Sequence, residues 1–179
     1  MRWTWAAVGA LFFVQGIPAH AGDVECLFKL PPSPSIDQLA AAYRQGGVPA
    51  VTAVKNGVGY PAVLRCAKAP PSEQMQEFGR LIGRALAGYK LELATARVLA
   101  DRGVTQAQLD KAMALYRPDG LKGVRIADTA GAPSDEARRA IEAALKRAAT
   151  VLPPAAAEDA VYANYFFGRA SREHFATRF

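Results

Sequence analysis

The side chains that could do acid, base or nucleophilic chemistry are few in this chain. Its 179 residues include two histidines, His20 and His174, and two cysteines, Cys26 and Cys66. His20 lies in the predicted export signal described below, and the remaining His174 alone cannot build a multi-histidine metal site or a histidine relay within one chain. No serine stands in a G-x-S-x-G turn, and the glycines form no phosphate-binding loop of known spacing. We therefore expect a protein without catalytic residues, metal ligands or cofactors.

Carboxylates are the remaining candidates for chemistry. Glu73, Glu77, Arg80 and Arg84 follow one another at three- and four-residue steps, a spacing that places them on one face of a helix. Arginines beside glutamates hold the carboxylates ionised, which does not suit a general acid. We interpret this set as a solvated salt-bridge face. A glycan hydrolase that works with carboxylates alone stays the enzymatic alternative.

The N-terminal residues have the pattern of an export signal. Arg2 provides a positive start, residues 6–14 form an apolar run, and Ala19-His20-Ala21 matches the small-x-small pattern before a cleavage site. The apolar run is too short to span a bilayer, so we expect no transmembrane segment after the signal is removed. The sequence predicts a signal peptide over residues 1–21, one mature domain over residues 22–179, and a periplasmic location. Secretion to the medium is the alternative.

Export would bring both cysteines into an oxidising compartment. A disulfide between Cys26 and Cys66 is the prediction, because the chain has no C-x-x-C pair and no clustered histidines. The chain-entropy model assigns roughly 4 kcal/mol to a closed loop of about 41 residues. The bridge would tie the start of the mature chain to the segment before the longest helix.

Proline and glycine divide the rest of the chain into helices. Ser35 with Gln38 and Thr105 with Gln108 match the capping box, and Ser134 can cap another helix. The fold class predicted is all-α: a small irregular bundle of about five helices around a long central helix. The expected helices cover residues 35–43, 73–102, 105–117, 134–152 and 155–179. A loop is expected over residues 121–133. Residues 48–64 form either a two-turn helix, which we favour, or a short hairpin near residues 50–60.

The long central helix carries a G-x-x-x-G spacing, Gly79 and Gly83. In a helix surrounded by water this spacing is more typical of close packing against another helix than of dimerisation in a membrane. We therefore expect a neighbouring helix to approach closely at these glycines.

The last segment is unusually aromatic, because six of the twelve Phe and Tyr residues that follow the predicted signal lie in its final eighteen positions. At 100° per residue they fall on two sides of a helix. Either the segment docks across the bundle, or one side contacts an acidic partner or a membrane surface. We expect Phe166 to be buried and Phe167 and Phe175 to be more exposed. The candidates for partner binding are Phe167, Arg169, Arg172, Phe175, Arg178 and Phe179.

The net charge of the chain indicates which kinds of partner it could bind. The chain holds 22 basic and 16 acidic residues, and the predicted signal removes one of the basic ones. A modest positive charge in an exported protein favours an acidic protein or another anionic envelope component over nucleic acid. The sequence therefore predicts a protein-binding module of the inhibitor, immunity or envelope-adaptor type. The alternatives are the glycan hydrolase and a carrier of a small apolar ligand.

Overall fold

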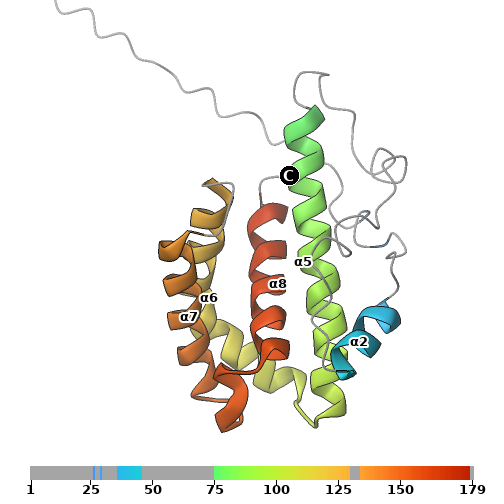
Figure 1. Cartoon of the computed structure of the whole chain (residues 1–179), viewed down its shortest axis with the longest axis vertical. Coiled ribbons are helices and arrows are strands. Elements are labelled where there is room, and N and C mark those ends of the chain that lie inside the picture. Colours follow the sequence, from blue (N-terminus) through green and yellow to red (C-terminus); the bar gives the residue numbers. More distant parts are fainter. Residues whose placement is uncertain (1–25, 27–28, 30–35, 46–74, 130–133, 178–179) are drawn as a thin grey trace, which may run out of the picture.

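The computed structural model describes residues 26, 29, 36–45, 75–129 and 134–177 (Figure 1). Every regular element within these ranges is helical, and no strand occurs among them. The all-α prediction is confirmed for this part of the chain. Its elements are α2 (Ile36–Arg44), α5 (Met75–Asp101), α6 (Gln106–Thr129), α7 (Asp135–Ala149), the 3-10 helix η2 (Pro154–Ala157) and α8 (Ala160–Ala176).

Several predictions concern residues outside these ranges. The signal peptide over residues 1–21, the helix or hairpin over residues 48–64, and Cys66 all lie outside the described residues. The export signal and the Cys26–Cys66 disulfide therefore stay predictions, as does the single mature domain.

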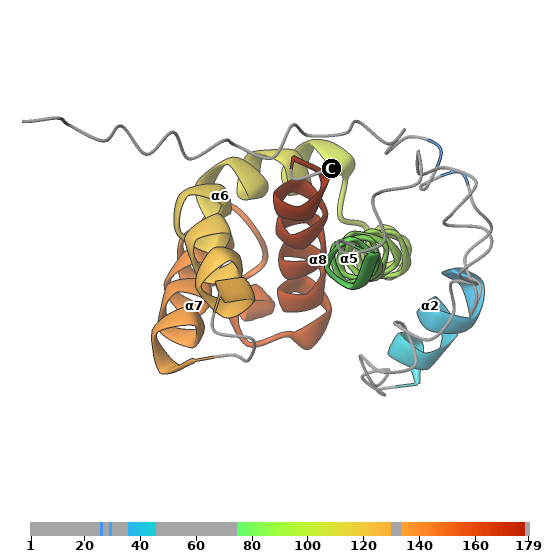
Figure 2. The same cartoon turned by 90° about the horizontal axis from the view of Figure 1, so that it is seen from above.

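The long helix α5 lies between α2 and α8, and α6 and α7 pack together on the side of α8 away from α5 (Figures 1 and 2). Arg44 Nη2 lies 2.6 Å from Asp101 Oδ2, and Arg97 pairs with Asp37, so two ion pairs join α2 to α5. The apolar core runs through all five α-helices and includes Leu39, Ile82, Leu99, Leu109, Tyr116, Leu145 and Phe166. Within the described residues, no helix combines the length and apolar composition needed to cross a bilayer.

Helix ends follow the local sequence signals. Thr105 N–H donates to Gln108 Oε1 at 2.8 Å, and Gln108 N–H donates to Thr105 Oγ1 at 3.3 Å, which is the predicted capping box. Ala137 N–H donates to Ser134 Oγ at 3.2 Å and caps α7 in the same way. After α5, Gly103 has a φ of +80°, a left-handed conformation that favours glycine. The predicted starts of α6 and α7 and the stop of α5 are confirmed.

Helix α6 contradicts the predicted loop of residues 121–133 as far as Thr129, because the helix continues through Pro118 to that residue; residues 130–133 lie outside the described ranges. Its glycines make room for neighbours instead of breaking the helix. A Cβ on Gly120 would lie 2.0 Å from the Tyr116 ring, and a Cβ on Gly123 would lie 2.6 Å from Ile141 Cγ1 of α7. Proline removes the N–H that would bond to Ala114 O, but Ala114 is an exposed residue, so water can replace that donor. Tertiary packing therefore overrides the local breaking signal.

The closest approach of two helices is at Gly88 of α5 and Gly168 of α8. A Cβ on Gly88 would lie 2.6 Å from Gly168 O, and a Cβ on Gly168 would lie 2.8 Å from Gly88 O. The prediction of a close approach at Gly83 is wrong, because no atom lies within 4 Å of a Cβ built there. Sequence spacing alone did not separate the glycine that packs from the one that does not.

Alanine at these two positions should have opposite effects on stability. Gly88→Ala is expected to lower the free energy of unfolding by roughly 1–3 kcal/mol, because backbone atoms of α8 would have to move away from the new methyl group. Gly83→Ala is expected to raise it by roughly 0.5–1 kcal/mol, because alanine is the better helix former and the space is open. Urea unfolding of both variants measures the difference. Equal effects would contradict the close contact between α5 and α8.

Candidate functional site

The aromatic side chains of α8 lie mostly inside the protein. Phe166 is 0% exposed, as predicted, but Phe175 is only 4% exposed, so its predicted exposure is wrong. Phe167 is half-buried and packs against the core. Because α8 lies between α5 and the α6–α7 pair, both of its aromatic sides meet a neighbour. Arg178 and Phe179 lie outside the described residues.

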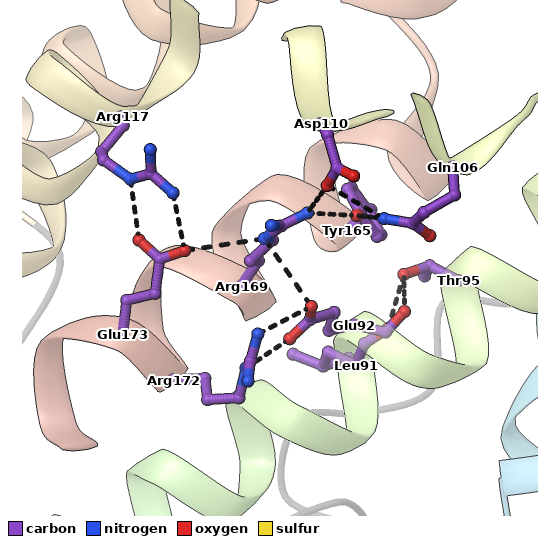
Figure 3. Close-up of polar contacts among 10 residues, drawn as sticks. All are labelled: Leu91, Glu92, Thr95, Gln106, Asp110, Arg117, Tyr165, Arg169, Arg172 and Glu173. Carbon is purple, nitrogen blue, oxygen red and sulfur yellow. Dashed lines mark hydrogen bonds and ion pairs between the residues drawn. The ribbon is translucent and has the colours of Figure 1, made fainter. Parts of the chain in front are cut away.

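Arg169, one of the predicted partner-binding residues, takes part in contacts between helices (Figure 3). Its Nη1 donates to Asp110 Oδ1 of α6 at 2.6 Å and to the Tyr165 hydroxyl at 3.0 Å. Its Nε lies 3.5 Å from Glu173 Oε1, one turn further along α8. Hydrogen bonds from Arg169 and Gln106 hold the pKa of Asp110 below its ordinary value. Arg169 is therefore part of an ion-pair network that joins α8 to α6.

Arg172 extends this network to α5. Its Nε lies 2.6 Å from Glu92 Oε2, and its Nη2 donates to Glu92 Oε1 at 3.0 Å. The Glu92 side chain is only 12% exposed, and burial raises its pKa, although the charge and hydrogen bond of Arg172 act in the opposite direction. On the other side, Arg117 of α6 donates to both carboxylate oxygens of Glu173, at 3.0 and 3.1 Å. Three helices thus meet through paired charges.

A second charged cluster lies where α5, α6 and α8 meet near the end of α8. Arg84 pairs with the buried Asp128, and His174 Nε2 lies 3.4 Å from Asp128 Oδ2. The Arg84 guanidinium lies over the Phe175 ring, 5.6 Å from its centroid. His174 is thus partly buried against α6. Arg84 belongs to the face of α5 that the sequence predicts to be a solvated salt-bridge face. It pairs instead with Asp128 of α6.

These clusters have the geometry of connections between helices. A general acid needs a carboxyl group whose proton can be transferred, whereas Asp110, Asp128 and Glu173 each contact a guanidinium. Among the described residues, no group of three or more His, Cys, Asp or Glu side chains could hold a metal ion. The polar interior is therefore best explained as an internal framework, and a binding site has to be sought on the surface.

The outward face of α6 is such a surface. Lys111, Leu115, Pro118, Lys122 and Arg125 follow one another at helical spacing and are all exposed; we call this set the α6 basic stripe. Leu115, at 38% exposed, is the one large apolar side chain that is exposed among the described residues. Figures 1 and 2 show that α6 bends along its length, so the stripe follows a bent helix axis.

The acids of α6 explain why this stripe carries only positive charge. Asp110 pairs with Arg169 of α8, Asp119 with Arg147 of α7, and Asp128 with Arg84 of α5. All three therefore serve contacts with neighbouring helices. Lys111, Lys122 and Arg125 have no ion-pair partner within the described part of the chain.

Sequence reasoning missed this stripe because it ended the helix at Pro118. A helix that ends at Pro118 leaves Lys111 and Leu115 on the helix and puts Lys122 and Arg125 in a loop. If the helix is continued through the proline, the steps of four, three, four and three residues give all five residues the spacing of one helical face, which follows the bend of α6.

Comparison with known proteins identified no relative of this chain. No protein-family model matches the chain, and searches of curated proteins and of solved structures found no significant match.

Proposed function

We propose that the protein is an exported, non-catalytic protein-binding module that contacts its partner through the α6 basic stripe. The observation that supports this function is the distribution of charge on α6. Its acids contact neighbouring helices, while Lys111, Lys122 and Arg125 face solvent without a described counter-charge. Such an arrangement favours association with an acidic surface and speeds the encounter with it.

The alternatives lack a comparable observation. A carboxylate-based hydrolase needs an accessible pair of carboxyl groups with distinct protonation states. In the described interior, Glu92 is paired with Arg172, and Asp128 with Arg84. The aromatic tail, first proposed as the contact surface, contributes its rings mainly to the core. The contact surface that we propose is therefore on α6 and not on α8.

Export remains part of the proposal and rests on the signal pattern in residues 1–21. Cleavage would leave a mature chain that begins at Gly22 and carries the predicted Cys26–Cys66 bridge in the periplasm. N-terminal sequencing of the envelope fraction and thiol labelling of the unfolded protein test this part. An intact Met1 terminus or two free thiols would contradict it.

Affinity capture from periplasmic extract tests the binding function. The full mature protein is compared with the Lys122→Glu/Arg125→Glu variant and with Arg139→Glu/Lys146→Glu on the exposed face of α7, which changes the net charge equally. We expect a partner that the wild type and the α7 variant retain and that the α6 variant loses, with weaker capture at high salt. Equal capture by both variants would contradict the proposed surface.

A further inference from the structure

We infer that α7 forms an interaction surface for a second copy of this chain, with the two α7 helices antiparallel across a two-fold axis. Figures 1 and 2 show α7 at the edge of the bundle, beside α6 and on the side away from α5. One side of the helix is buried in the core, through Ala137, Ala144, Leu145 and Ala148, and the opposite side is exposed. Another molecule can therefore reach the outer side of α7.

This outer side carries charges of alternating sign. Four exposed residues follow one another at steps of three, three and four residues, which places them along one side of the helix: Glu136, Arg139, Glu142 and Lys146. We call this set the α7 charge row. Its order from the N-terminal end is negative, positive, negative, positive. Within the described part of the chain, none of its four members has an ion-pair partner.

The other charged side chains of α7 have partners within the protein. Arg138 forms an ion pair with Asp135, and Arg147 pairs with Asp119 of α6. The α7 charge row itself has two carboxylates and two cations, so it attracts neither an acidic nor a basic partner over a distance. A row of this kind selects a partner by the order of its charges instead.

The order of charges in this row is complementary to itself when it is reversed. In an antiparallel pair, Arg139 of one copy faces Glu142 of the other, and Glu136 faces Lys146. The two-fold axis repeats both contacts, which gives four ion pairs. The midpoints of the two kinds of contact differ by half a residue, or roughly 0.75 Å along a helix, so one arrangement satisfies both. A parallel pair in register would place like charges opposite each other. A second copy in the antiparallel direction is thus the partner that the row favours.

The expected dimer is weak. Exposed ion pairs contribute little individually. The exposed apolar residue between the charges is Ala143, which is small enough to let two helices approach but buries little apolar area. We therefore expect a dissociation constant on the order of 1 mM.

Charge reversal at two positions tests the pairing on the full mature protein. Sedimentation equilibrium at protein concentrations up to about 1 mM measures the association. Arg139→Glu and Glu142→Arg each place like charges opposite each other, twice because of the symmetry. Each variant alone should therefore associate at least about tenfold more weakly than the wild type. In an equimolar mixture the two altered side chains face each other with opposite charge, so association should return to about the wild-type strength.

Arg125→Glu on α6 is the matched control, because it changes the net charge as Arg139→Glu does and should leave the dimer unaltered. Thermal unfolding of each variant verifies that these exposed substitutions keep the fold. A wild-type protein that stays monomeric up to about 1 mM would overturn the inference, and the α7 charge row would then be a solvated surface. A mixture that does not regain association would overturn it as well, and so would a dimer that only Arg125→Glu disrupts.

The outcome of this experiment is separate from the proposed function. Partner capture is assigned to the α6 basic stripe, and each copy of the chain carries its own stripe. A monomeric Arg139→Glu variant should therefore still capture the partner from periplasmic extract. If the dimer is absent while capture depends on α6, the α7 inference fails and the binding function stands.

Discussion

Replacing Phe166 by alanine is expected to lower the free energy of unfolding by roughly 3–5 kcal/mol. The Phe166 ring is fully buried and stacks on Tyr116 with 5.2 Å between ring centroids. It also meets the edge of Tyr165, again at 5.2 Å. Truncation would remove these ring contacts and leave a cavity between α6 and α8. Chemical denaturation of the purified variant measures the loss.

Phe167 provides the matched control, because it is the same residue type at the next position of α8. It is half-buried, so Phe167→Ala should cost only about 1–2 kcal/mol. Phe175→Ala should resemble Phe166→Ala, since its ring is buried under the Arg84 guanidinium. If Phe175→Ala lowers the free energy of unfolding only slightly, the result would support the hypothesis that the aromatic side of α8 with Phe167 and Phe175 is a contact surface.

Local chemistry decided which features the sequence could predict. The capping box at Thr105 and the cap at Ser134 act within a few residues, and the stop at Gly103 depends on one dihedral angle. Such signals can be read without knowing the neighbours. The helix ends confirmed in the structure are of this kind, and so is the all-α class.

Features that depend on a neighbouring helix could not be predicted in this way. Pro118 and Gly120 resemble a helix stop until α7 and the Tyr116 ring pack against the same stretch. The burial of Phe175 depends on α8 lying between its neighbours. The ion pair between Arg172 and Glu92 joins residues 80 positions apart, and no local pattern links them. The candidate binding surface was hidden for the same reason, because its recognition required an unbroken α6.

The Glu92→Ala substitution is expected to be as severe as the loss of the Phe166 ring, at roughly 3–5 kcal/mol. Glu92 lies at the buried end of the ion-pair network that joins α5, α6 and α8. Two nitrogens of Arg172 contact its two carboxylate oxygens, and Arg169 Nε lies 3.8 Å from Glu92 Oε1. Removing this carboxylate leaves two guanidinium groups, each partly buried, without their shared counter-charge. Unfolding in urea measures the effect, and its size should fall little in high salt because the pair is shielded from ions.

Glu92→Gln separates the charge of this side chain from its shape. Burial raises the pKa of Glu92, so the folded state takes up a proton more readily than the unfolded state does. The stabilising contribution of this titration is therefore present at low pH and is lost as pH rises through the raised pKa. Glutamine is neutral at all pH values, so it also removes the counter-charge, but it keeps the volume of the side chain and an acceptor for Arg172, and its cost should therefore be smaller than that of alanine. The advantage of wild type over Glu92→Gln should also shrink as pH rises. Glu92→Gln could prove as destabilising as Glu92→Ala, with a difference between wild type and Glu92→Gln that does not vary with pH. In that case the ionised carboxylate stabilises the contact between α5 and α8 by more free energy than its burial costs.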